Sequence, residues 1–232
     1  MTNQPGADLP ARVTVVTPTI PGREDLLARA MASVRAQTIP VRHEVERDAT
    51  GRGPGATRNR AMARVDTEWI AFLDDDDELH PWHCEKLLAH ADTTGADLVW
   101  SQYDVIGYDG RMRKQPPPRM PPHTPLSVLD ERNFIPITYL IRRSLVESFG
   151  GFQEDFCPED HQFLIDARDA GMTVSHLPIR TWIVRQHSSN THGQPGWAWR
   201  MYEQSRVSFE PEAEGRDVNT MGEGLRLRKQ DR

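Results

Sequence analysis

The chain has 232 residues, of which 37% are hydrophobic and 27% charged, and this composition is typical of a folded globular protein rather than a disordered or membrane-embedded chain. Its formal net charge of −6 excludes a generally basic protein, so any affinity for nucleic acid has to come from a local patch. The two cysteines, Cys84 and Cys157, have no paired spacing, which indicates neither a disulfide scaffold nor a zinc site. With no apolar run near the roughly 18 residues of a membrane span, and no signal-peptide layout, we expect a cytoplasmic protein without a transmembrane segment.

The first half of the sequence alternates between predicted strands and helices. A β-branched run at residues 13–17, ended by Pro18, predicts a buried strand, and apolar residues at helical spacing predict a helix over 23–37. The elements expected next are a strand at 41–47, a Gly-rich turn at 49–55, a helix at 56–65, a strand at 69–73 and a helix at 81–91. This order is that of a doubly wound α/β sheet.

The second half is less regular. We expect a strand at 97–108 that turns into a hairpin at Asp109-Gly110, and a Pro-rich loop at 115–125. The later elements are expected to be strands near 137–141, near 174 and at 182–185, and a helix at 158–170. The chain is thereby divided into a polar leader at 1–10, one domain at 11–206 and a mobile tail at 207–232.

Four consecutive aspartates, residues 74–77, directly follow the predicted buried strand at 69–73. Ligands of open α/β sheets bind outside the carboxyl ends of the strands. Four carboxylates in such a place repel one another unless they share a cation, and oxygen ligands of this kind suit Mg²⁺ or Mn²⁺ bridging to a diphosphate. A solvated acidic turn is the alternative. A softer metal site is weakly indicated by His80, His83 and Cys84.

Four segments of the sequence resemble, in this order, the family-2 glycosyltransferases of the GT-A fold: VVTPTIPGREDLLARAMASVRAQT, GPGATRNRAM, WIAFLDDDDELHP and GGFQEDFCPEDHQFLIDARDAG. The resemblance spans about Val13 to His187. It implies an α/β fold of the GT-A type, with a Rossmann-like nucleotide-binding half, a mixed central sheet and a smaller acceptor-side half. The donor half is then expected at about 11–109 and the acceptor half at about 126–206.

The resemblance implies a donor site around the aspartates. They fill the family's D-x-D element, in which Asp76 is expected to bind the metal that holds the donor diphosphate. The other residues expected on the donor side are Thr17, Pro18, Thr19, Asp48, Arg58, Asp74 and Asp75. At the nucleotide-binding turn, Ile20-Pro21 replaces the family's Tyr-Asn, so the donor pocket is expected to differ. Asp48 is expected to meet the base edge, with a turn-forming role as the alternative.

The resemblance also supplies candidates for the base and for a further metal ligand. Pro158-Glu159-Asp160 matches the family's E-D element, whose Asp is the catalytic base, although the same residues also make a good helix start. His187 stands where a His in the family often completes the metal site, and an ordinary surface His is the alternative.

The implied reaction transfers a sugar from a nucleotide diphosphate sugar, with uridine as the expected base, to an acceptor hydroxyl with inversion. An alcohol is a poor nucleophile near neutral pH, so a carboxylate such as Asp160 is needed to take its proton. Mn²⁺ or Mg²⁺ stabilises the leaving diphosphate. The alternatives are a non-catalytic nucleotide-sugar binding module of the same fold and a nucleotidyltransferase, which should have a Gly-rich basic loop that residues 17–23 lack.

Local charge suggests an acceptor class. Residues 110–129 carry four cations and no acid, and residues 177–206 carry four cations and one acid. The second stretch also contains Trp182, Trp197 and Trp199. A phosphate-bearing acceptor, such as a hydroxylated base in DNA, would use the cations for phosphates and the tryptophans for stacking. The acceptor-side candidates are Arg111, Arg113, Trp197 and Trp199, and ordinary surface arginines are the alternative.

Overall fold

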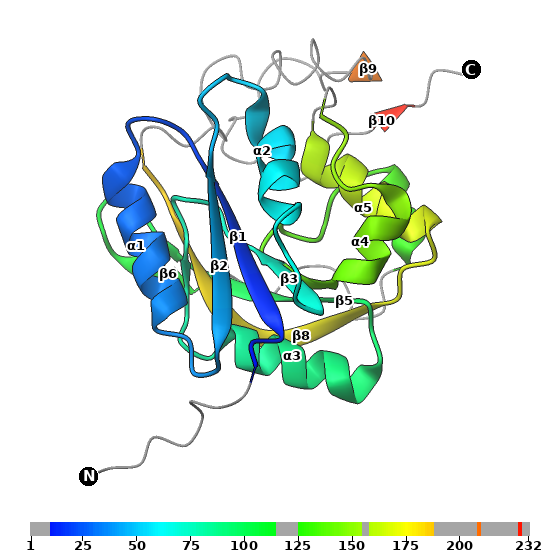
Figure 1. The fold of residues 1–232 in the computed structure, drawn as a ribbon, viewed down its shortest axis with the longest axis horizontal. Coiled ribbons are helices and arrows are strands. Elements are labelled where there is room, and N and C mark those ends of the chain that lie inside the picture. The colour runs from blue at the N-terminus through cyan, green and yellow to red at the C-terminus, as the bar shows by residue number, and fades with distance from the viewer. Residues whose placement is uncertain (1–9, 115–124, 155–157, 188–207, 210–226, 229–232) are drawn as a thin grey trace.

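The structure is a computed structural model that describes residues 10–114, 125–154, 158–187, 208–209 and 227–228 (Figure 1). Trp197, Trp199, nearly all of the predicted leader and most of the predicted tail lie outside the described residues, and the predictions made for them stay predictions. Within the tail, β9 (Ser208–Phe209) and β10 (Leu227–Arg228) pair as a short antiparallel ladder.

Three parallel strands form one side of the main sheet, as the sequence predicts (Figure 1). β1 (Val13–Thr19) lies between β2 (Val41–Arg47) and β3 (Trp69–Phe72), and α1 (Glu24–Arg35) and α2 (Gly53–Met62) make the connections. β1 does not end at Pro18 as predicted but continues to Thr19. Pro18 lies beyond Val16, the last residue of β1 that pairs with β3, so its missing N–H breaks no bond to that strand.

The rest of the main sheet is mixed. Its order is β2-β1-β3-β7-β5-β8-β4, and β7 (Tyr139–Arg142) runs antiparallel to both β3 and β5 (Leu98–Ile106). The remaining elements are β4 (Glu78–Leu79), α3 (His83–Thr94), β6 (Met112–Lys114), the 3₁₀ helix η1 (Leu126–Asp130), α4 (Arg143–Phe149), α5 (Glu159–Asp169) and β8 (Val174–Arg185). The expected hairpin at Asp109-Gly110 joins β5 to β6. The mixed α/β architecture confirms the predicted fold class.

Two predicted strands near residues 174 and 182–185 are in fact one strand, β8. The pairing of β5 with β8 jumps from Ser101↔Leu177 to Gln102↔Arg180. Pro178 and Ile179 therefore lie in a bulge, where no ladder hydrogen bond needs the N–H that proline lacks. The prediction of two strands was wrong, because the bulge lets one strand continue through both segments.

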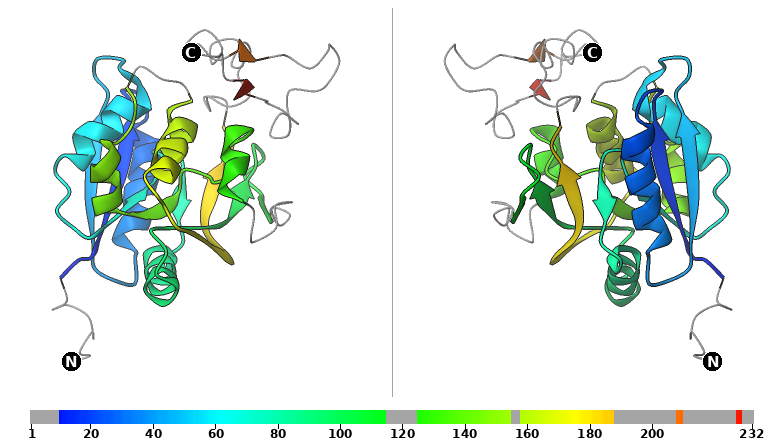
Figure 2. Two further views of the ribbon diagram at one scale, coloured as in Figure 1. Left: turned by 90° about the vertical axis from the view of Figure 1, so that its right-hand side faces the viewer. Right: turned by 90° about the vertical axis from the view of Figure 1, so that its left-hand side faces the viewer.

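Two apolar clusters lie on opposite faces of the main sheet. One contains Ala61 of α2, Val146 of α4 and Phe163 of α5, and the other contains Ala30 of α1 and Leu87 of α3. Figures 1 and 2 show α3 beneath the strands in all three views. Helices thus cover both faces of the sheet, and the loops at the carboxyl ends of the parallel strands are left to build a site.

Candidate functional site

The candidate site forms where β1 and β3 end. The aspartate run follows β3 directly, Thr19 closes β1, and His187 lies two residues beyond the end of β8. Asp160 is in the first turn of α5. Segments far apart in the sequence are therefore brought to one edge of the sheet.

Three of the four aspartates form an acidic cluster. Carboxylate oxygens of Asp74, Asp76 and Asp77 lie within 4.8 Å of one another, and Asp76 Oδ2 is 3.1 Å from His187 Nε2. Burial, followed by the charges of Asp76 and Asp74, raises the pKa of Asp77 well above its usual value, and burial with Asp74 also raises the pKa of Asp76. Asp74 is partly exposed, and the mutual repulsion of these carboxylates is the arrangement that a divalent cation would relieve.

Asp75 is held by partners outside the aspartate run. Thr19 Oγ1 donates a 2.6 Å hydrogen bond to Asp75 Oδ2, and Arg23 Nη1 lies 2.8 Å from Oδ1 and 3.4 Å from Asp76 Oδ2. Sequence reasoning missed Arg23, which no local pattern connects to the aspartate run more than 50 positions away. Gly22, with φ +87°, supplies the backbone conformation that leads from that turn into α1.

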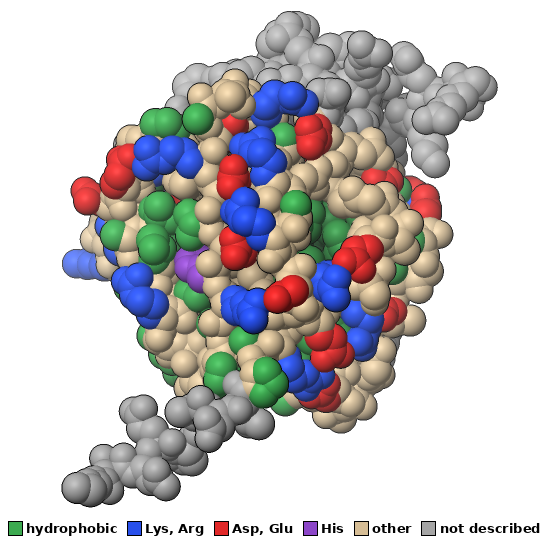
Figure 3. All heavy atoms as spheres, in the orientation of Figure 1, with side chains coloured by type: hydrophobic (Ala, Val, Ile, Leu, Met, Phe, Trp, Pro, Cys, Tyr) green, Lys and Arg blue, Asp and Glu red, His purple; other side chains and the backbone are tan. Residues whose placement is uncertain are grey.

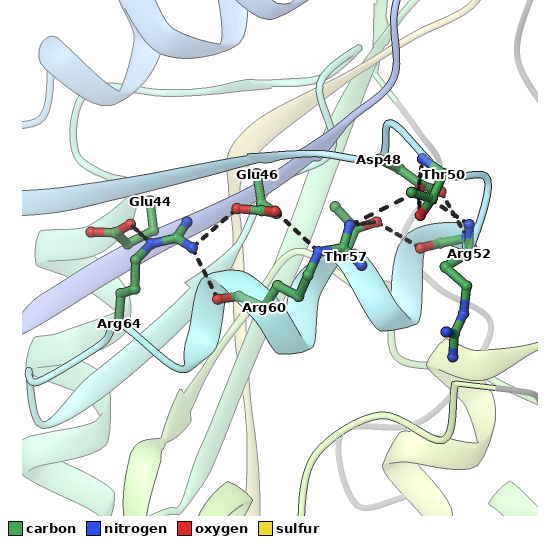
Figure 4. A network of polar contacts seen from close by, with 9 residues as sticks. Glu44, Glu46, Asp48, Thr50, Arg52, Thr57, Arg60 and Arg64 are labelled. Atoms are coloured by element: carbon green, nitrogen blue, oxygen red, sulfur yellow. Dashed lines mark hydrogen bonds and ion pairs between the residues drawn. The ribbon is translucent and has the colours of Figure 1, made fainter.

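Asp48 shapes the loop before α2 (Figure 4). Its carboxylate accepts hydrogen bonds from the backbone N–H groups of Gly53 at 2.7 Å, Arg52 at 3.1 Å and Thr50 at 3.3 Å. Burial alone would raise the pKa of Asp48, but these backbone bonds outweigh it and lower the pKa. The arrangement is the turn-forming one that the sequence left open as the alternative. Contact with a donor base stays a prediction.

Thr17 and Pro18, which were also predicted on the donor side, have their recorded contacts with β2 rather than with the aspartate run. Thr17 Oγ1 is 2.9 Å from Nε2 of His43 on β2, so this side chain bonds across the sheet. Pro18 pairs in register with Glu46. Of the three β1 residues predicted on the donor side, Thr19 is the one whose side chain contacts the aspartate run.

Arg58 is buried between the two halves of the site. Its Nη2 lies 2.6 Å from Asp74 Oδ1, and its Nη1 lies 3.0 Å from Oε1 of Glu159. Burial alone would lower the pKa of Arg58, but the charges of Asp74 and Glu159 outweigh it and raise the pKa. The sequence motif indicates Glu159 only as the neighbour of Asp160. No local pattern indicates that Glu159 would contact Arg58, 101 positions away.

Asp160 is partly buried at the start of α5. Asn133 Nδ2 donates to its Oδ2 at 3.3 Å, and the N–H of His161 donates to its Oδ1 at 2.8 Å. Burial raises the pKa of Asp160, while the charge of Arg58 acts in the opposite direction. A carboxylate with a raised pKa is a stronger base. Asn133 was not predicted, because it sits in a loop with no regular pattern.

The basic residues expected on the acceptor side are largely engaged. Arg113 pairs with Asp109 at 2.8 Å, Arg180 with Asp104 at 3.2 Å, and Arg185 with Glu78. Arg111 is exposed. On the face drawn in Figure 3, cationic and acidic side chains alternate rather than gathering by sign.

Trp182 and the suggested soft-metal residues belong to the core. Trp182 is only 3% exposed and packs on Tyr103, with ring centroids 4.7 Å apart, so the prediction that it lies among the acceptor-side cations as a stacking residue was wrong. His83 is buried with its Nδ1 2.7 Å from Thr181 Oγ1. Burial raises the pKa of the Cys84 thiol to about 12, which leaves it inert. Within the described residues, the aspartates form the one cluster suited to a metal ion.

Comparisons with known proteins agree with the fold. The family model described as glycosyl transferase family 2 matches residues 40–150, which include Arg58 and the aspartate run but end before Asp160. The chain is 38% identical over 60 residues to the succinoglycan biosynthesis protein ExoO of Rhizobium meliloti (strain 1021), a stretch that is 26% of this chain and 17% of ExoO.

Solved structures of S. aureus TarS 1–349 share the fold. The complex with UDP-GlcNAc has a TM-score of 0.64 at 19% identity over 77% of this chain and 60% of TarS 1–349. The complex with UDP has a TM-score of 0.63 at 18% identity over 83% of this chain and 64% of TarS 1–349. The chain therefore spans less than two thirds of ExoO and of TarS 1–349. No helix of the described residues is both long and apolar enough to cross a membrane. The segment 40–150 is therefore similar to glycosyl transferase family 2, and the chain shares the fold of the TarS structures over most of its length.

Proposed function

We propose that the chain transfers a sugar from a UDP-sugar to an acceptor hydroxyl in a metal-dependent reaction that inverts the anomeric centre. The observation that carries the proposal is that Arg58 links an acidic cluster, suited to a cation, to the helix start that bears Asp160. The TarS structures with UDP-GlcNAc and with UDP support the donor class.

The residues present fit a resident Mn²⁺ or Mg²⁺. Asp74, Asp76 and Asp77 would hold the ion, with His187 beside Asp76. Bound there, it would supply positive charge to the leaving diphosphate. Thr19 and Asp75 keep the guanidinium of Arg23 next to this cluster, where it adds a fixed positive charge of the protein's own.

Asp160 acts as the base. As the acceptor oxygen attacks the anomeric carbon, Asp160 takes the hydroxyl proton, and the bond from that carbon to the diphosphate oxygen breaks on the opposite side of the sugar. A single displacement of this kind inverts the anomeric centre. Asn133 and the N–H of His161 orient the carboxylate for the transfer.

The donor half of the proposal is tested by thermal stabilisation. UDP at about 100 times its Kd should stabilise the protein by about 2.7 kcal/mol in Mn²⁺ or Mg²⁺, and by much less in a chelator, because an ion held by Asp76 would supply positive charge to the diphosphate. Asp76→Ala should abolish the difference. The matched control is Asp66→Ala, which removes an exposed aspartate paired with Arg42. Equal stabilisation by UDP with and without metal would remove the cation from the mechanism.

For the acceptor, we propose a phosphate-bearing molecule, with DNA as one example. The support is the pair of cation-rich stretches in the sequence and the exposed position of Arg111. If Arg111 meets a phosphate, Arg111→Ala should flatten the plot of log K for the acceptor against log salt by about 1. Arg42→Ala, which alters a distant exposed arginine on β2, should leave that slope unchanged. Salt-independent acceptor binding, or efficient transfer to a phosphate-free glycan, would contradict a phosphate-bearing acceptor.

A further inference from the structure

The side chain of Arg58 is already paired with two carboxylates of the protein, and we call this pairing of Arg58 with Asp74 and Glu159 the brace. Its side chain is 4% exposed, and its two terminal nitrogens are each directed to a different carboxylate, Asp74 on the donor side and Glu159 on α5. The guanidinium carbon also lies 5.4 Å from the centroid of the Phe152 ring. A planar guanidinium is suited to holding two groups in a fixed relation, which a flexible ammonium cannot do.

The helix that carries Arg58 is itself fixed against the segment before α5. Asn59 Nδ2 donates to the carbonyl oxygen of Phe152 at 2.8 Å, and the N–H of Phe152 donates to Asn59 Oδ1 at 2.9 Å. A Cβ on Gly55 would lie 3.0 Å from Cγ of Glu159, so α2 and Glu159 are already in close contact. Three positions within two turns of α2 therefore hold the segment that leads into Asp160.

We propose that Arg58 is a positioning residue that holds Glu159, and with it the neighbouring Asp160, at a fixed place relative to the acidic cluster. The inference rests on the proposed function, because a base and a leaving group must face opposite sides of one sugar. It differs from the role implied by the family resemblance, which puts Arg58 on the donor base or diphosphate. The buried Nε of Arg58 has no hydrogen-bond partner among the described residues, so donor binding is the competing role to be tested.

The first measurement separates turnover from donor binding. Arg58→Lys keeps a positive charge but cannot bridge two carboxylates, so kcat should fall by about 10- to 100-fold while the donor KM and the metal-dependent stabilisation by UDP stay near the wild-type values. Glu159→Gln, which leaves Arg58 in place, should have the same effect. The double variant should be no slower than the slower single variant, because both changes break one contact.

The matched control lies in the turn just beyond the end of the same helix. Arg64 pairs with Glu44 at 2.7 Å in an exposed position, and Arg64→Lys should leave kcat unchanged. If Arg58→Lys fails to fold, Glu159→Gln decides through its kcat and UDP binding. Loss of UDP stabilisation in Arg58→Lys but not in Glu159→Gln would overturn the inference and make Arg58 a donor ligand. Additive effects of the two changes on kcat would also overturn it.

A second measurement does not depend on activity. If the wild-type chain neither binds UDP nor transfers sugar, the proposed function fails, and the brace is decided by a double-mutant cycle on the free energy of unfolding. Arg58→Lys and Glu159→Gln should be coupled more strongly than Arg64→Lys and Glu44→Gln. Additivity at the buried pair would overturn the brace even in an active enzyme.

Discussion

Asp160 is affected by its surroundings in two opposite ways. Burial raises the pKa of its carboxyl, which strengthens it as a base, and the nearby charge of Arg58 favours the ionised form that can accept a proton. Asn133 and the N–H of His161 fix its orientation. This combination of burial, opposing charge and fixed orientation is what a general base needs, and a residue that merely starts a helix does not need it.

Asp160→Asn should therefore separate these two roles. The amide keeps the shape of the side chain but cannot take a proton, so turnover should fall by roughly 10²- to 10⁴-fold while UDP still stabilises the protein. Asp169→Asn, at the exposed end of the same helix, is the control. Turnover near the wild-type rate in Asp160→Asn would leave Asp160 as a helix-start residue only.

Single residues also show what a sequence can and cannot indicate. The aspartate run could be located because it follows a buried strand, but its division of labour depends on partners distant in sequence. Asp75 is held by Thr19 and Arg23, which are more than 50 positions away, and the sequence had placed Asp75 on the donor. Such pairings arise from the packing of the chain and leave no local periodicity to find.

The elements that could be predicted are those whose burial repeats along the sequence. α1 and β3 differ from the prediction only at their ends, because buried strands and amphipathic helices carry a regular apolar pattern. β2 is an exception, since it has the predicted bounds although none of its residues is fully buried. α4 was missed because seven residues give too few turns for a pattern, although Gly150 marks its end with φ +88°. β4 has only two residues and is formed by its pairing with β8.

The contact between α2 and the segment before α5 gives a prediction at this scale. Gly151 has φ +86°, and a Cβ there would lie 2.7 Å from Asn59 Oδ1, which accepts the N–H of Phe152. Gly151→Ala should therefore lower the free energy of unfolding by roughly 1–2 kcal/mol from backbone strain, and by about 1–3 kcal/mol more from the lost hydrogen bond.

The adjacent glycine is the matched control for this change. Gly150 has φ +88°, but a Cβ there would meet nothing within 4 Å, so Gly150→Ala should show the backbone strain alone. Urea unfolding of both variants measures the difference. Equal destabilisation would mean that Asn59 does not hold this segment.

Across the whole molecule, several histidines are kept neutral by the core. Burial lowers the pKa of His43 to about 4 and of His83 to about 3, and it also lowers the pKa values of His161 and His176. Each of these groups binds a proton in the unfolded chain near pH 6.5 but not in the folded one. The unfolded state therefore binds more protons below that pH, and the folded protein loses stability as the pH falls.

His83 offers the sharpest test of this effect, because it is fully buried and its Nδ1 contacts Thr181 Oγ1. Its stabilising contribution is complete above about pH 6.5 and is lost as the pH falls toward about 3, at up to about 1.4 kcal/mol per pH unit. His83→Asn can keep a hydrogen bond to Thr181 but has no proton to bind, so it should lower stability at pH 7 while making the pH dependence shallower between pH values of about 6 and 4. Urea unfolding of both proteins across this range measures the two slopes, and parallel curves would show that His83 takes up its proton equally well in the folded protein.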